Sequence, residues 1–241
     1  KILNKIIFTF TIFLILIGFG NYSFAQSVEV TIQPVAIIET NLGNIVIEFL
    51  SDAAPNHVQN FIKLSRDGFY DETLFHRIIP GFMIQGGDPN TISGDPNTWG
   101  QGGPDETLDA EFNKIKHNRG IVSMARSADP NSAGSQFFIV HRDSNSLDEE
   151  YTVFGRLATE SSFDTLDKIA AVQTGTNDRP IDPERVKINK ITIVDRTDIP
   201  DIMDLGIPEL TASSISEFSG SQNQIFESQE LGITFSAPVG W

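Results

Sequence analysis

Two polar side chains interrupt an apolar segment at residues 75–88, whose sequence is FHRIIPGFMIQGGD. Arg77 and Gln85 lie on either side of Ile79-Pro80-Gly81, which is typical of a turn between two strands. Strand alternation puts Arg77 on the same face as Phe75, so a guanidinium is expected among core-forming residues. A charge in such surroundings is either paired with an acid or available to a ligand. This segment alone leaves both interpretations open.

The other reactive residue types form no motif for a metal, a nucleophile or a nucleotide. The four histidines show no metal-ligand spacing, there is no cysteine, and no serine sits in a nucleophile elbow. The glycines of 100–103 do not open a helix after a strand. The acids between Asp88 and Glu111 lack the spacing of a calcium loop and are expected as solvated turn residues. The sequence therefore predicts no metal and no cofactor.

Composition narrows the classes of partner. A chain of 241 residues suits one domain of ordinary size with additional segments. Its formal net charge of -15 argues against nucleic acid and anionic membranes as partners. A solvated acidic surface, which keeps a protein soluble, is the simpler account of this charge.

The first 25 residues have the features of an export signal. Lys1 and Lys5 precede an apolar run at 6–20, and Ser23-Phe24-Ala25 places small residues where a signal peptidase reads them. The run is shorter than the roughly 20 residues of a membrane span. We therefore expect cleavage after Ala25 and an exported, extracytoplasmic protein without stable membrane insertion. An anchor formed by an uncleaved segment is the alternative.

Hydrophobic periodicity predicts many strands and two helices. Residues 35–40 and 44–50 read as a hairpin, and further strands are expected at 120–125, 136–140, 147–155 and 186–194. Helical spacing recurs from Pro55 to Gly68 and again at 163–172. Phe137 and Phe138 point to opposite faces of their strand, so one can pack in the core while the other lines a groove. This order favours an antiparallel barrel capped by helices.

Three motifs in their order and spacing resemble the cyclophilin family of peptidyl-prolyl cis-trans isomerases. They are the 75–88 segment, GSQFFI at 134–139 and TVFG at 152–155, and the likeness runs from about 36 to 195. The resemblance implies a mainly β fold, a closed antiparallel eight-stranded barrel capped by two α-helices. It places this domain at 35–198, after a linker at 26–34.

The resemblance also assigns the site. Arg77 would donate to the prolyl nitrogen of an Xaa-Pro bond, and Gln85 would hold the substrate carbonyl and order Arg77. Phe82 completes the catalytic set, and the substrate-binding positions are His76, Met83, Ala125, Arg126, Gln136, Phe138, Leu147 and Tyr151. The chain departs from many family members at two of these positions, with Arg126 in place of Asn and Tyr151 in place of His.

The implied partners are proline-containing unfolded or extended polypeptides, bound by a monomer that assists the folding of extracytoplasmic proteins. A non-catalytic module that binds proline peptides, or a holdase chaperone, would use the same groove. Beyond 198 the chain becomes polar and rich in serine, and residues 232–235 read as a strand. We therefore expect 199–241 to be a linker and the start of a further segment.

Overall fold

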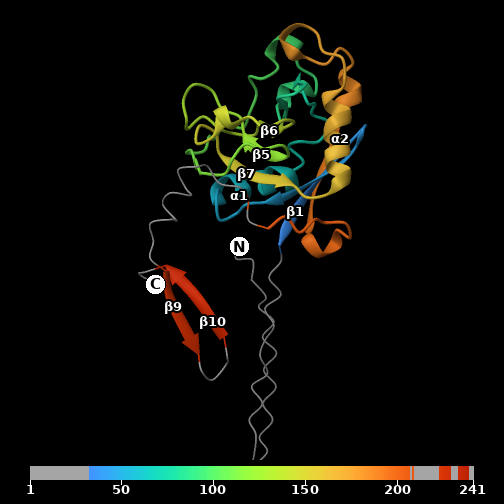
Figure 1. Ribbon diagram of the computed structural model, residues 1–241. Helices are drawn as coiled ribbons and strands as arrows, with labels where there is room; N and C mark the ends of the chain where they lie inside the picture. The colour runs from blue at the N-terminus through green and yellow to red at the C-terminus, as the bar shows by residue number, and fades with distance from the viewer. Residues whose placement is uncertain (1–32, 207, 209–222, 229–232, 239–241) are drawn as a thin grey trace, which may run out of the picture. The chain divides into compact units, whose positions relative to one another are not determined.

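The structure is a computed structural model that describes residues 33–206 and 208, and two strands within 223–238 (Figure 1). The predicted signal peptide at 1–25 and nearly all of the predicted linker at 26–34 lie outside the described residues. The strands of the main sheet are β1 (Pro34–Thr40), β2 (Gly43–Phe49), β3 (Arg77–Ile79), β4 (Met83–Gly86), β5 (Ile121–Met124), β6 (Phe137–Val140), β7 (Val153–Leu157) and β8 (Ile188–Asp195). The α-helices are α1 (Pro55–Arg66) and α2 (Glu160–Ala170). Short 3-10 helices occur at Pro89–Thr91, Pro96–Thr98, Asn145–Leu147, Thr176–Asp178, Pro183–Val186 and Arg196–Asp198.

The eight strands form one antiparallel sheet in the order β3-β4-β6-β5-β7-β2-β1-β8. This arrangement confirms the predicted mainly β fold with eight antiparallel strands and two helices. The barrel is less closed than predicted, because its two edges meet only just before β3 and β8. There Leu74 and Lys187 form an isolated bridge, flanked by a bond from the Phe75 amide to the Val186 carbonyl at 3.1 Å. The sheet is therefore curled and joined at one end.

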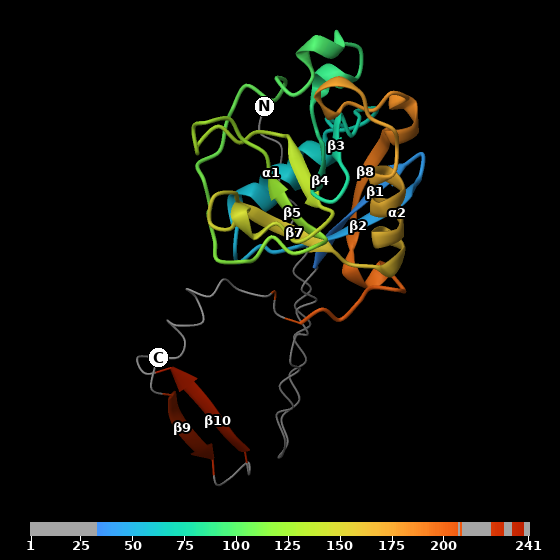
Figure 2. The ribbon, with the colours of Figure 1, turned by 45° about the horizontal axis from the view of Figure 1, so that its top comes forward.

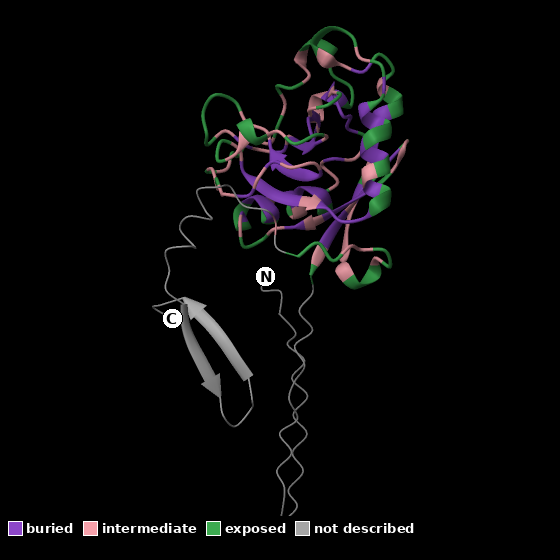
Figure 3. Cartoon of the chain, viewed as in Figure 1, coloured by how far each residue is buried: buried purple, intermediate pink, exposed green. Residues whose placement is uncertain are grey.

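Proline in the first turn marks the start of one helix, and a capping hydroxyl marks the start of the other. Helix α1 starts at Pro55, as the sequence predicts, and buries Val58, Phe61 and Leu64 against the sheet. Helix α2 starts three residues before the predicted segment, because Thr159 caps it by accepting a hydrogen bond from the Ser162 amide. The polar first turn of α2 hid this start from hydrophobic periodicity. Figure 2 shows α2 running past β2 and β8, and Figure 3 shows its buried and exposed stripes.

Apolar residues lie on both faces of the sheet around β6. On one face, Phe137 packs with Phe61, Tyr70 and Phe75 in the main core. On the other face, Phe138 joins a second cluster. The predicted division between the two phenylalanines is thus observed. An apolar outer face on a barrel strand is unusual, since that face normally meets water, and it marks the place where a ligand can be bound.

The segment after β8 continues along the barrel. The Met203 amide donates to the Ala158 carbonyl at 2.8 Å, and Arg156 donates to the Gly206 carbonyl at 2.8 Å. Hydrogen bonds to the barrel therefore extend beyond residue 198. Strands β9 (Asn223–Ser228) and β10 (Ile233–Pro238) pair as a separate antiparallel hairpin, which contains the strand predicted at 232–235. Among the described residues, no helix has the length and apolar character needed to span a membrane.

Candidate functional site

A row of four residues crosses the outer face of the sheet. Arg77 on β3 pairs with Gln85 on β4, Gln85 pairs with Phe138 on β6, and Phe138 pairs with Ser123 on β5. Residues directly opposite each other in antiparallel strands share a face. The row thus places a guanidinium, an amide and an aromatic ring side by side. Gly87, directly after β4, has φ at 84°, and a Cβ there would lie 2.5 Å from the Ser135 carbonyl oxygen.

An apolar cluster of side chains lies next to this row. Met83 and Phe138 are 2% and 5% exposed, and they pack in one cluster with the partly buried side chains that the sequence assigned to the same site. We use the name apolar pocket for the side chains of Phe82, Met83, Ala125, Phe138, Leu147 and Tyr151. The rings of Phe138 and Tyr151 meet edge to face, with centroids 5.5 Å apart. Residues from four separate segments are therefore brought together.

Arg77 is only half-buried, and a single acid contacts it. Its side chain is 43% exposed, and its Nε lies 3.5 Å from Asp178 Oδ2. No other hydrogen bond or ion pair of its guanidinium is found in the described part of the chain. Of the two interpretations drawn from the sequence, each holds in part, because Nε is paired while the terminal nitrogens remain available.

Gln85 does not order Arg77 through a hydrogen bond. Gln85 Nε2 donates to Gln136 Oε1 at 2.9 Å, and Gln136 Nε2 donates to the Gly102 carbonyl at 2.8 Å. The two predicted glutamines therefore form a relay that leads away from the arginine. The sequence offered no signal for Asp178, because this residue lies on a loop 101 positions after Arg77.

A polar groove of about 530 Å³ adjoins the apolar pocket at Ala125. Its lining includes Arg126 as the one charged side chain and no acid, which is notable in a chain of net charge -15. The lining residues are Gln85, Gly100, Gln101, Gly102, Gly103, Pro104, Thr107, Ala125, Arg126, Ser127, Ser132, Gly134, Ser135 and Gln136. An extended polar chain fits such a surface.

Some backbone groups that follow β5 already form hydrogen bonds within the protein. The Ala125 amide donates to the Gln136 carbonyl at 2.9 Å. Among the described backbone contacts, the Ala125 carbonyl and both the amide and the carbonyl of Arg126 have no backbone partner. Backbone pairing of these two predicted substrate-binding residues with a peptide is therefore restricted to these three groups.

His76 lies behind the groove instead of at its edge. The residue is 3% exposed, and neither ring nitrogen has a hydrogen-bond partner within the described structure. Burial lowers the pKa of His76 to about 4, against the opposing charge of Asp88. Asp88 is itself fully buried and accepts from the amides of Asn90 and Gly100. The expectation of a solvated turn residue is therefore wrong for Asp88.

A buried serine and histidine, together with a partly buried aspartate, support Phe138 from the far side of the row. His117 Nε2 lies 2.9 Å from Ser123 Oγ, and its Nδ1 lies 3.1 Å from Asp148 Oδ1. The imidazole stacks on Phe138 with centroids 6.0 Å apart. Ser123 and His117 are 0% exposed, so this group of side chains is closed to a substrate in the structure. Burial lowers the pKa of His117, although Asp148 opposes the shift.

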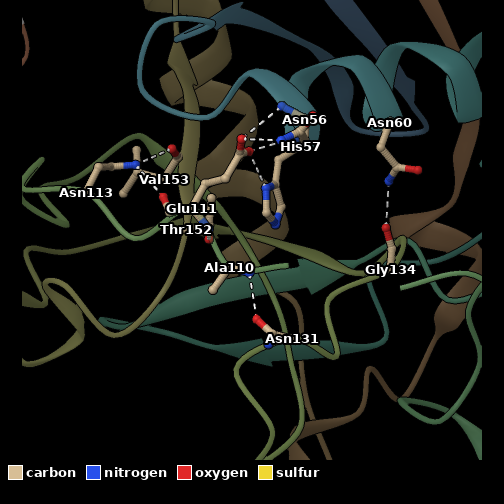
Figure 4. A network of polar contacts seen from close by, with 10 residues as sticks. All are labelled: Asn56, His57, Asn60, Ala110, Glu111, Asn113, Asn131, Gly134, Thr152 and Val153. Atoms are coloured by element: carbon tan, nitrogen blue, oxygen red, sulfur yellow. Dashed lines mark hydrogen bonds and ion pairs between the residues drawn. The ribbon is translucent and has the colours of Figure 1, made fainter. Parts of the chain in front are cut away.

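Glu111 fastens the loop beside the groove to helix α1 (Figure 4). Its Oε1 accepts from the Asn56 amide at 3.1 Å, and its Oε2 accepts from the His57 amide at 3.0 Å and lies 2.6 Å from His57 Nδ1. Burial alone would raise the pKa of Glu111, but these hydrogen bonds from His57 and Asn56 lower it. A carboxylate at a helix N-terminus also interacts favourably with the helix dipole. Glu111 is thus a second acid that is not a solvated turn residue.

Replacing Glu111 by glutamine should lower the free energy of unfolding by about 2 kcal/mol, the usual scale for losing hydrogen bonds to a charged group. The amide has one acceptor oxygen where the carboxylate offers two to α1. Urea denaturation at pH 7 measures the change. Glu106→Gln is the matched control, because Glu106 is exposed on the same loop. An equal loss in both variants would contradict a specific role for Glu111.

Comparisons with known proteins agree with this geometry. Residues 35–193 match the family model described as cyclophilin type peptidyl-prolyl cis-trans isomerase/CLD. Peptidyl-prolyl cis-trans isomerase CYP18-1 of Arabidopsis thaliana is 44% identical over 158 residues, which cover 65% of this chain and 93% of that protein. A peptidyl-prolyl cis-trans isomerase of Synechococcus elongatus is 43% identical over 148 residues, covering 59% of this chain and 97% of that protein.

A solved structure shows the same likeness. A cyclophilin-type peptidyl-prolyl cis-trans isomerase of Cryptosporidium parvum, crystallised in the presence of the dipeptide Ala-Pro, superposes with a TM-score of 0.60 at 35% identity. The match covers 67% of this chain and 99% of that one. Fold and site thus define a curled eight-stranded β-barrel with an apolar cluster and a polar groove on its outer face. The chain belongs to the cyclophilin family of peptidyl-prolyl cis-trans isomerases.

Proposed function

We propose that this protein accelerates cis-trans isomerisation of Xaa-Pro bonds in unfolded or extended polypeptides by stabilising the twisted amide at Arg77. The bond turns over a barrier of roughly 18 to 20 kcal/mol, because resonance gives the amide partial double-bond character. In the twisted state the prolyl nitrogen regains its lone pair and can accept a hydrogen bond. A donor aimed at that nitrogen lowers the barrier without a covalent step.

The availability of the Arg77 terminal nitrogens beside the apolar pocket carries this proposal. The proline ring would pack against the surface of the apolar pocket, where the near-complete burial of Phe138 and Met83 provides a dry contact. Asp178 holds Nε, so the fork of the guanidinium can point at the substrate. Gln85 and Gln136 would bind the peptide carbonyls, and the Ala125 carbonyl would pair with the extended backbone.

The primary test is the exchange rate of a short Xaa-Pro peptide, measured by NMR with and without the purified protein. An acceleration by about five decades requires roughly 7 kcal/mol of differential stabilisation. Strong acceleration supports the proposal. Peptide binding without acceleration would instead indicate a recognition module, and suppression of aggregation without either would indicate a holdase.

We further propose that the protein acts outside the cytoplasm, on chains that fold after export. The proposal rests on the charged start, the apolar run at 6–20 and the small residues before Gln26. Amino-terminal sequencing of the protein recovered from its native host tests it. A start at Gln26 in an extracytoplasmic fraction is expected, and an intact leader in the cytoplasmic fraction would refute the proposal.

Replacing Asp178 by asparagine should lower kcat/KM about three- to fivefold, since an exposed ion pair contributes up to about 1 kcal/mol. Asn177 and Asp178 both have left-handed backbone angles, with φ at 61° and 58°, and asparagine tolerates this region as aspartate does. The substitution thus removes the charge and keeps the loop. Asp182→Asn, exposed on the following turn, is the control. An unchanged rate in Asp178→Asn would show that Arg77 needs no partner.

A further inference from the structure

The guanidinium of Arg126 is hydrogen-bonded within the protein, so it is not a free cation. Its Nε and Nη2 both donate to the Glu150 carbonyl, at 3.0 and 2.9 Å. Its Nη1 donates to the carbonyls of Ser127 at 3.0 Å and Ala128 at 3.4 Å. In addition, the Glu150 carboxylate lies 3.5 Å from Nη2. The side chain is only 15% exposed, so little of the guanidinium remains for a substrate.

The flat face of the same guanidinium packs on two aromatic rings. The Arg126 Cζ atom lies 4.9 Å from the centroid of Tyr151 and 5.6 Å from that of Phe112. Tyr151 in turn meets Phe138 edge to face. Phe112 is 41% exposed and follows Glu111, which is fastened to α1. One side chain therefore connects the end of β5, the segment 147–151 and the loop fastened to α1.

We propose that Arg126 is a positioning residue of the apolar pocket, which holds the segment 147–151 against Phe138 and so keeps Leu147 and Tyr151 in place for the substrate. The inference rests on the proposed function, because it names what that pocket needs in order to bind proline. Only a planar fork can donate twice to one carbonyl and stack on rings at the same time. Lysine at this position keeps the charge but loses both features.

The alternative is that Arg126 attracts acidic substrates through its charge. The two roles differ in their dependence on salt, because exposed charges are screened while buried bonds and stacked rings are screened much less. They also differ in their effect on Tyr151, which only a positioning role would move. Arg119 is a matched control, since it also lies over a ring, that of Phe163 at 5.4 Å, and donates to a carbonyl, that of His141 at 2.9 Å. It takes no part in the apolar pocket.

The experiment compares Arg126→Lys and Arg119→Lys in the full chain labelled with 3-fluorotyrosine. The chain has three tyrosines, so Tyr151→Phe assigns the Tyr151 signal, and the fully buried Tyr70 reports on the core. In Arg126→Lys we expect the ¹⁹F signal of Tyr151 to shift and that of Tyr70 to stay. We expect KM and the peptide Kd to rise about fivefold, the equivalent of one cation–π contact, with kcat nearly unchanged. Arg119→Lys should leave all of these values as in the wild type.

Three outcomes would overturn the proposal. The first is an unchanged Tyr151 signal with unchanged Kd, and the second is an equal rise of Kd in Arg119→Lys. The third is a difference between Arg126→Lys and wild type that disappears at about 0.5 M salt, where exposed charges are screened. The peptide Kd and the ¹⁹F signals need no turnover, so they remain decisive even if the wild type does not isomerise the peptide. A failure of the proposed function is thus distinguished from a failure of this inference.

Discussion

Replacing Arg77 by alanine should lower kcat/KM for Xaa-Pro isomerisation by about 10²- to 10³-fold, the loss seen when one preorganised donor to a transition state is removed. The rate should fall because no other cation in the described structure shares the outer-face row with Gln85 and Phe138. Binding of the ground-state peptide should change much less than the rate. The measurement is the NMR exchange rate at several enzyme concentrations, together with the peptide Kd.

The same substitution should leave the protein folded. The Arg77 side chain is 43% exposed and forms one ion pair of 3.5 Å, so its removal should cost less than about 1 kcal/mol of unfolding free energy. Arg77→Lys retains the charge but not the fork, and it should recover only a small part of the rate. Arg66→Ala, exposed at the end of α1, is the control for the loss of a surface cation. Full activity in Arg77→Ala would refute the assigned mechanism.

Strand alternation predicted only part of this site, because Phe75, which it put on the face of Arg77, packs in the main core with Phe137. The family resemblance, not alternation, assigned Phe138 to the groove. Arg77 and Gln85 flank a turn at equal distance from Gly81, so a hairpin must place them opposite each other, as it does. The two neighbouring phenylalanines must point to opposite faces, and Phe138 is the one on the outer face. These relations follow from a period of two residues and a short turn. They need no knowledge of the rest of the chain.

Contacts between loops were not predictable in this way. Asp178 reaches Arg77 from a 3-10 turn with left-handed backbone angles, and Asp148 reaches His117 from another loop. Neither acid has a periodic pattern around it. Arg126 was expected among the substrate-binding positions, whereas its fork is used by carbonyls and rings of the protein itself. The conformation of these loops depends on the packing of the whole fold, which a local pattern cannot report.

The structure differs from the family resemblance at one predicted site residue, His76. His76 was expected to contact the substrate, but the strand begins only at Arg77, so alternation does not apply to the residue before it. His76 turns inward beneath the loop that ends at Gly100, and its Nε2 would lie 3.8 Å from a Cβ at that glycine. The groove wall is therefore built over a histidine that has no hydrogen bond in the described structure.

Acidification should destabilise the fold through this histidine. The pKa of His76 is lowered to about 4 in the folded protein, mainly because burial disfavours the charged ring, whereas an unfolded chain restores it to about 6.5. Above pH 6.5 both states are neutral, and the stability is at its full value. Between pH 6.5 and 4 only the unfolded state gains the proton, so the unfolding free energy should fall as the pH falls, by up to about 3 kcal/mol. Burial lowers the pKa of His117 as well, which adds a loss of the same sign.

Urea denaturation at a series of pH values between 7.5 and 4, in wild type and His76→Phe, measures this dependence. Phenylalanine cannot titrate, so the variant should lose a large part of the slope below pH 6.5. At pH 7 its stability should stay close to that of the wild type, because the ring nitrogens of His76 have no hydrogen bonds to lose. An equal slope in both proteins would show that other groups, such as Glu111, carry the acid sensitivity. Since His76 lies behind Gly100, the groove wall should loosen before the whole barrel unfolds, and the peptide Kd should weaken at a higher pH than global unfolding.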